Sequence, residues 1–173
     1  FAWVKGVQRT ELFQSMVAPY APYALRGFLW YQGETNIMAG NVTAYADKQT
    51  AVIAGWRRAW NLPDAPFYGV LLAPMDYSKW EKFPVTDAAL PAFWAEQARA
   101  LSAPHTGFVV TTDLVTNTHD IHPTNKRDIG LRLARLALAE TYGRTDLPAR
   151  GPTFASLQTA GDRLALTFAH PAG

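Results

Sequence analysis

Three short apolar runs constrain the fold of this chain more than any other feature. They are GFLWY at residues 27–31, FYGVLLA at residues 67–73 and GFVVTT at residues 107–112. None of them alternates with polar residues, which is typical of parallel strands that are covered on both faces. The runs therefore predict a parallel sheet with a layer of helices on each side.

Helical patterns lie between and around these runs. Residues 42–60 repeat apolar side chains at helical spacing, and Asn41 is the predicted N-cap of this helix. Two further helices are predicted at residues 91–101 and 124–142, and a short one at residues 11–18. Alternating strands and helices predict an α/β fold, in which the site lies beyond the carboxyl ends of the strands.

The pattern changes after residue 150. Residues 152–168 alternate as two strands around Ala160-Gly161-Asp162, which is typical of a hairpin, and no helix follows. We therefore predict an α/β unit at residues 1–150 and, at residues 151–173, the first hairpin of a truncated β-rich domain. The first residue is Phe1 rather than Met, and we interpret the chain as an internal piece of a longer protein.

Composition excludes several classes of protein. The chain has no Cys, which rules out disulfides, a thiolate nucleophile and Cys-ligated metal sites. The 16 basic and 14 acidic residues give a net charge of +2, too small to predict a nucleic-acid partner. No apolar run approaches the roughly 20 residues of a membrane span, so no membrane partner is predicted either.

A polar segment, Q-G-E-T-N, follows the first apolar run. Gln32 and Asn36 carry side-chain N–H donors and Gly33 a backbone N–H, and donors that converge at a strand end could form an oxyanion hole. The alternative is an ordinary polar turn. Glu34 could orient a neighbouring group or pair with an arginine.

A second polar segment, H-D-I-H-P, follows the third run and precedes a helix. A neutral His122 at this position could accept a proton from a nucleophile, and Asp120 could orient its ring. Asp113, directly after the strand, is the second candidate for that orienting role. His119, Asp120 and His122 are also metal-ligand types, so a metal-dependent hydrolase is an alternative, as is a surface loop.

Read together, these segments resemble the sialate O-acetylesterase family. The matching segments are M-V-A-P at 16–19, R-G-F-L-W-Y-Q-G-E-T-N at 26–36, A-E-Q at 95–97, and D-I-H-P-T-N-K at 120–126 with Gly130, Arg132 and Leu133. The resemblance implies a flavodoxin-like, SGNH-type serine hydrolase with a three-layer sandwich. It also implies removal of O-acetyl groups from sialic acid or other acetylated sugars, no cofactor and no metal, and a periplasmic or secreted location.

Carried over to this chain, the family pattern makes His122 the general base and Asp120 its partner. Gln32 and Gly33 would contact the oxyanion, with support from Glu34 and Asn36. A carbohydrate-binding module without catalytic activity is the alternative outside the enzymes.

The family nucleophile is a Ser in a G-Q-S-N-M-like segment upstream of every match. None of the four serines of this chain has that setting; they are Ser15, Ser78, Ser102 and Ser156. We therefore predict that a companion N-terminal segment carries the catalytic Ser and that the 173-residue chain alone is inactive.

Overall fold

The computed structural model describes residues 10–21, 23–80 and 85–170. The outermost residues of both predicted units, 1–9 and 171–173, lie outside the described residues. The elements in chain order are α1 (Glu11–Met16), η2 (Ala18–Tyr20), β1 (Phe28–Trp30), α2 (Glu34–Met38), α3 (Tyr45–Ala59), β2 (Phe67–Val70), η3 (Tyr77–Lys79), α4 (Ala89–Ala100), β3 (Thr106–Val109), α5 (Lys126–Glu140), β4 (Thr153–Ala160) and β5 (Arg163–Ala169).

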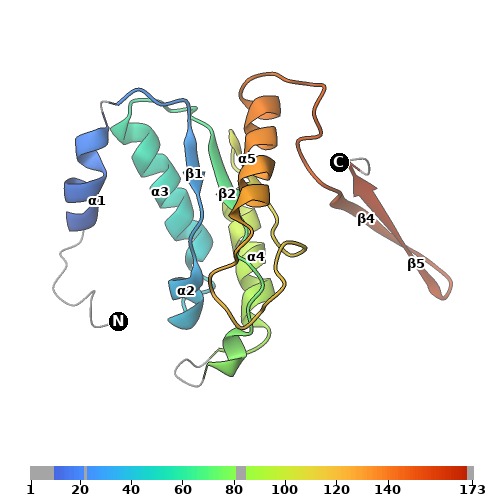
Figure 1. The fold of residues 1–173 in the computed structure, drawn as a ribbon. Helices are drawn as coiled ribbons and strands as arrows, with labels where there is room; N and C mark the ends of the chain where they lie inside the picture. The colour runs from blue at the N-terminus through green and yellow to red at the C-terminus, as the bar shows by residue number, and fades with distance from the viewer. Residues whose placement is uncertain (1–9, 22, 81–84, 171–173) are drawn as a thin grey trace.

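Strands β1, β2 and β3 form one parallel sheet in that order. Phe67 of β2 is opposite Phe28 of β1 on one side and Thr106 of β3 on the other. Helices α3 and α4 pack on one face of the sheet, and α5 packs on the other (Figure 1). The predicted α/β three-layer arrangement with a parallel sheet is confirmed.

Strand alternation divides the core into two halves. Phe67 points toward α3 and packs with Ile53, whereas its neighbour Tyr68 points the other way, toward Leu133 of α5. Helix α5 contacts β2 and β3, and on that face Leu29 of β1 remains 62% exposed. The expectation that every strand is covered on both faces therefore holds for β2 but not for β1.

The beginnings of the helices show where local signals are weak. Helix α3 starts at Tyr45 with Ala44 at its N-cap, so the predicted N-cap at Asn41 is wrong. The backbone N–H of Asn41 donates instead to the Asn36 carbonyl at the end of α2. Helix α2 itself was not predicted. It has no side-chain cap and depends on the burial of residues such as Ile37, which is fully buried.

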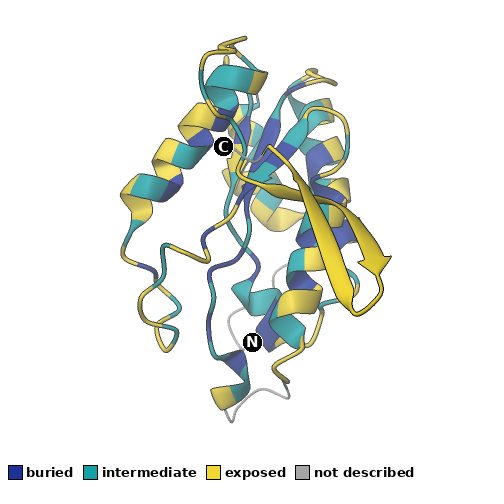
Figure 2. Ribbon diagram, turned by 90° about the vertical axis from the view of Figure 1, so that its right-hand side faces the viewer, coloured by how far each residue is buried: buried dark blue, intermediate teal, exposed yellow. Residues whose placement is uncertain are grey.

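The predicted hairpin is confirmed as β4 and β5, which pair antiparallel around a turn with Gly161 at φ 62°. Every residue of both strands is exposed, and Figure 2 shows the hairpin exposed along its whole length. Its place in a β-rich domain stays a prediction. In the described ranges, no helix combines the length and apolar character needed to cross a bilayer.

Candidate active site

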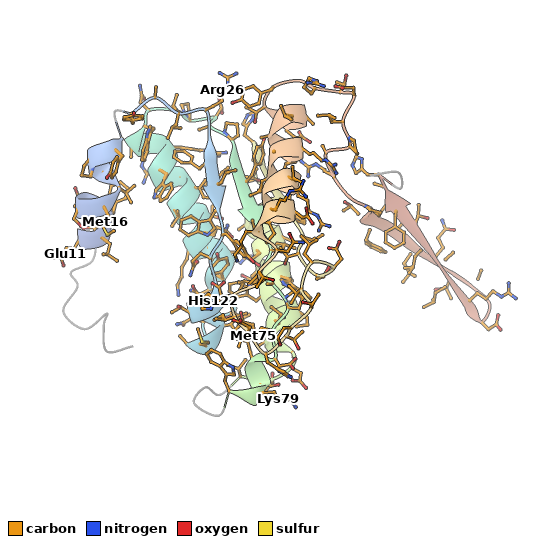
Figure 3. The ribbon with its side chains drawn as sticks, in the orientation of Figure 1. Glu11, Met16, Arg26, Met75, Lys79 and His122 are labelled. Atoms are coloured by element: carbon orange, nitrogen blue, oxygen red, sulfur yellow. The ribbon has the colours of Figure 1, made fainter. Side chains whose placement is uncertain are left out.

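The carboxyl ends of the three parallel strands meet at one edge of the sheet. His122 and Met75 lie at this end of the molecule, and Arg26, which precedes β1, lies at the opposite end (Figure 3). The two polar segments singled out in the sequence follow β1 and β3, so the topology brings them to the same edge.

Gly33 makes the sharp turn between β1 and α2. Its φ of 152° disfavours any residue with a side chain. A Cβ at this position would lie 2.5 Å from the Phe93 ring and 2.9 Å from Leu72, both fully buried. The Gly33 N–H donates to the Glu34 carboxylate at 3.1 Å, so in this structure it is engaged within the turn rather than pointing at a substrate.

Gln32 lies in a hydrogen-bonded network that joins three elements. Its Nε2 donates to Asn36 Oδ1 at 2.8 Å, which brings together the two amides predicted as donors. The Tyr45 hydroxyl of α3 donates to the Gln32 carbonyl at 3.0 Å and to its Oε1 at 3.2 Å. Trp30 Nε1 donates to the same hydroxyl at 3.3 Å. The Gln32 amide is therefore held in one orientation.

Glu34 begins α2 and has no ion-pair partner among the described basic residues. The predicted alternative of a pair with an arginine is thus not found in the described part of the chain. Burial raises the pKa of Tyr31 to about 12, and the Glu34 carboxylate adds to the rise. Burial followed by Glu34 likewise raises the pKa of Tyr77. Both hydroxyls therefore stay protonated beside this carboxylate at neutral pH.

The second polar segment forms a tight loop before α5. Asp120 Oδ1 accepts the backbone N–H of His122 at 2.8 Å and lies 3.5 Å from His122 Nδ1. The carboxylate therefore braces the loop and also lies close to the ring nitrogen that it was predicted to orient. The His122 side chain is 86% exposed, which leaves its imidazole accessible to a reactant or another segment.

Two contacts hold this loop against the Gln32 turn. Ile121 packs against the buried cluster that contains Ile37 of α2, and Tyr31 borders the same cluster. Lys126 at the start of α5 places its Nζ 5.1 Å from the centre of the Tyr31 ring, a cation–π distance. The predicted base and the predicted donors are thus attached to the same small cluster.

Asp113 does not orient His122, which corrects the second candidate for that role. Its carboxylate forms a two-pronged pair with the Arg132 guanidinium, at 2.8 and 2.5 Å. The hydrogen bond from Arg132 holds the pKa of Asp113 below its usual value. Arg132 also donates to the Val110 carbonyl at 2.7 Å, so the pair fastens α5 to the end of β3.

The geometry does not favour the metal alternative. His119 Nδ1 lies 3.2 Å from Asp76 Oδ2, on the loop after β2, so His119 is paired outside the proposed set. Within residues 10–21, 23–80 and 85–170, no three His, Asp or Glu side chains are grouped as they would be to hold a metal ion.

Gln97 of α4 is a structural residue of the site whose environment the sequence did not reveal. It is fully buried, and its Oε1 accepts the Leu72 N–H at 2.9 Å while its Nε2 donates to the Val70 carbonyl at 3.3 Å. Trp94 donates to the Leu72 carbonyl at 2.7 Å. These bonds hold the chain where β2 ends. The sequence signals at this position were an amide on an apolar helix face and the A-E-Q match at 95–97.

Two of the four serines are engaged in local hydrogen bonds. The Ser15 hydroxyl donates to the Glu11 carbonyl at 2.7 Å, and the Ser102 hydroxyl to the Arg99 carbonyl at 2.8 Å. Ser156 lies on the exposed hairpin and Ser78 in η3. Ser78 borders a cavity of about 280 Å³ between the loop after β2 and the start of α4, with Asp76 and Trp94 in its wall.

Comparison with known proteins gives the family. The model of the family described as carbohydrate esterase, sialic acid-specific acetylesterase, matches residues 1–139. The chain is 31% identical over 157 residues to sialate O-acetylesterase of Rattus norvegicus and 29% identical over 161 residues to that of Homo sapiens. These matches cover 82% and 84% of this chain but only 28% and 30% of the relatives' length.

Solved structures agree with the sequence comparison. A carbohydrate acetylesterase from Xanthomonas citri superposes with a TM-score of 0.80 at 33% identity, covering 91% of this chain and 35% of that one. A protein of Arabidopsis thaliana superposes with a TM-score of 0.56 at 19% identity, over 68% of this chain and 46% of that one, and supports the fold alone. The chain belongs to the carbohydrate esterase family of sialic acid-specific acetylesterases.

Proposed function

We propose that this chain forms part of a carbohydrate O-acetylesterase, a carboxylic ester hydrolase acting on O-acetylated sialic acid or another acetylated sugar. The observation that carries the proposal is the meeting of the Gln32 turn and the His122 loop at the carboxyl edge of the sheet. The named activities of the family and of the relatives support the same reaction.

In the proposed mechanism, the His122 imidazole accepts the proton of a serine hydroxyl as its oxygen attacks the acetyl carbonyl carbon. The carbonyl oxygen becomes an oxyanion that accepts a hydrogen bond from the Gln32 amide. The bond from carbon to the sugar oxygen then breaks, and His122 returns the proton to that oxygen. Water gives a proton to His122 and attacks the acetyl carbon of the acyl-enzyme. The bond from that carbon to the serine oxygen breaks, His122 returns the proton to the serine, and acetic acid leaves and ionises to acetate.

The supporting residues act through position. Asp120 holds the His122 loop in shape and places a negative charge near Nδ1, where it stabilises the imidazolium. Asn36 holds one N–H of Gln32. Because the Gly33 N–H is engaged by Glu34, we assign Gly33 and Glu34 to maintaining the turn, and the oxyanion contact to the Gln32 side chain.

We propose further that the nucleophilic serine comes from a companion segment outside residues 1–173. Ser15 donates within its own helix, and Ser102 donates to the end of the helix before it. None of the four serines has the G-Q-S-N-M-like setting of the family nucleophile. The exposed His122 ring at the strand ends is accessible to such a segment.

The first test measures acetate release from 4-nitrophenyl acetate and from O-acetylated sialic acid by the intact protein. His122→Ala should lower kcat by about 10³-fold or more. The matched control is His105→Asn, an exposed histidine at the amino ends of the strands whose φ of 57° asparagine tolerates. Near-normal activity of His122→Ala would refute the assignment, and loss of activity in chelator would favour the metal alternative.

The second test identifies the nucleophile. The intact protein is treated with a fluorophosphonate, which forms a covalent bond with an activated serine, and the labelled peptide is identified by mass spectrometry. We expect the label outside residues 1–173. A stoichiometric label on Ser15, Ser78, Ser102 or Ser156 would contradict the companion-segment proposal.

A further inference from the structure

The amide of Gln32 is constrained at each end by a different element. Its oxygen accepts from the Tyr45 hydroxyl at 3.2 Å and shares that single proton with the Gln32 main-chain carbonyl, at 3.0 Å. Its nitrogen donates one N–H to Asn36 Oδ1 at 2.8 Å. A primary amide has two N–H donors and one oxygen. Within the described ranges, the second N–H of Gln32 has no acceptor.

The orientation of this amide decides its chemistry. With the oxygen held by Tyr45, the group offers only an N–H to the remaining direction. Rotated by 180°, it would offer an oxygen, which repels an oxyanion instead of stabilising it. A donor that is fixed before the reaction needs no rearrangement in the transition state, and this accounts for most of the benefit of an oxyanion hole.

Tyr45 is well suited to hold that orientation. It is only 3% exposed, and its ring packs 4.3 Å, centre to centre, from the Phe93 ring. Trp30 Nε1 donates to the hydroxyl oxygen at 3.3 Å, which directs the hydroxyl proton toward Gln32. Burial raises the pKa of Tyr45, although hydrogen bonds from Trp30 and Gln97 oppose the rise. The hydroxyl therefore stays a donor across the pH range in which an esterase works.

We infer that Tyr45, supported by Trp30, is a positioning residue that fixes the Gln32 amide with its free N–H toward the oxyanion. This inference rests on the proposed function, because it assigns Tyr45 a part in the same esterase reaction. Tyr45 is only 3% exposed, so we assign it no contact with substrate or nucleophile. Its effect on the rate passes entirely through Gln32.

The test is a double-mutant cycle in the intact protein, with kcat and KM measured on 4-nitrophenyl acetate. Tyr45→Phe removes the hydroxyl and keeps the ring that packs on Phe93. We expect kcat to fall about 10-fold with KM within twofold, since loss of a whole oxyanion donor costs about 10²- to 10³-fold. Gln32→Ala should show that larger loss. In the Gln32→Ala background, Tyr45→Phe should change kcat by less than twofold.

Tyr68→Phe is the matched control. Tyr68 is another buried tyrosine, 5% exposed. Its hydroxyl bonds Thr141 at 2.7 Å, the C-cap of the helix that covers the other face. It should leave kcat unchanged in both backgrounds. Equal losses from Tyr45→Phe with and without Gln32 would indicate a general structural role and overturn the inference, as would a Tyr45→Phe enzyme with normal kcat.

The proposed function fails in a different way. If the unmodified intact protein releases no acetate, the esterase proposal is overturned, and the role of Tyr45 with it. If the unmodified protein is active and His122→Ala is not, but Tyr45→Phe retains full kcat, only the positioning inference is overturned.

Discussion

Gly33→Ala is the substitution for which the structure predicts the clearest loss of stability. The added Cβ would lie 2.5 Å from two atoms of the Phe93 ring and 2.9 Å from Leu72, in a backbone conformation with φ 152°. Phe93 and Leu72 are both fully buried, so neither has solvent to move into. The turn that carries Gln32 must therefore shift or the core must open.

Two contributions set the magnitude. Forcing alanine into this backbone region costs about 1–3 kcal/mol. Overpacking a closed core costs about 1–3 kcal/mol more. The free energy of unfolding should fall by about 2–6 kcal/mol in total, a large part of the roughly 5–15 kcal/mol typical of a domain.

The assay is urea unfolding of the intact protein, followed by tryptophan fluorescence. Gly40→Ala is the matched control, because Gly40 also has positive φ, 69°, but a Cβ there meets no atom within 4 Å. Gly40→Ala should lower the free energy of unfolding by about 1–2 kcal/mol, because only the left-handed backbone conformation disfavours alanine there. If Gly33→Ala lowers stability by no more than Gly40→Ala, the argument from the Phe93 contact is refuted.

Two further predictions concern groups that fasten the strand ends. Gln97→Leu leaves the buried Leu72 N–H without its acceptor and should lower the free energy of unfolding by about 2–4 kcal/mol. The control Gln158→Leu, on the exposed hairpin, should change it by less than about 0.5 kcal/mol. Equal effects of the two substitutions in urea unfolding would contradict this prediction. Arg132→Ala should raise the pKa of Asp113 toward its usual value of about 4, as measured by carboxyl ¹³C NMR titration. Because Arg132 lowers the folded-state pKa of Asp113, the pair stabilises the fold above the unfolded-state pKa and loses this effect as pH falls through the lowered value. An unchanged Asp113 titration in Arg132→Ala would refute the pairing.

Much of the fold could be predicted because its signals are local. Continuous apolar runs predicted β1, β2 and β3. For β2 the reason is that a strand covered on both faces has no polar side to show. The hairpin followed from alternation around Gly161, which supplies the positive φ of the turn. Helix α2 had no such signal, because a five-residue helix without a side-chain cap depends on contacts with distant residues.

For the candidate site, too, some features could be predicted from the sequence and others could not. Its predicted residues were found at strand ends, a position that follows from chain order and parallel topology alone. The sequence did predict Asp120 beside His122, but it did not predict partners that come from other elements. Asp113 was a candidate partner for His122, but an arginine one helix later takes its carboxylate. Tyr45 lies within the predicted helix at 42–60, and nothing in that pattern showed that its hydroxyl donates to Gln32.

By itself, the sequence determined the fold class, the family and the edge of the sheet where the chemistry is expected. These features can be read from the sequence because the apolar periodicity of a segment reflects which of its residues are buried, and motif spacing involves only residues close together in the chain. The pairing of groups from different elements became visible only in the folded chain: Asp113 with Arg132, His119 with Asp76, and Gln32 with Tyr45. Hydrogen bonds and ion pairs require approach within about 3–4 Å, and sequence spacing does not encode that approach for groups on different elements.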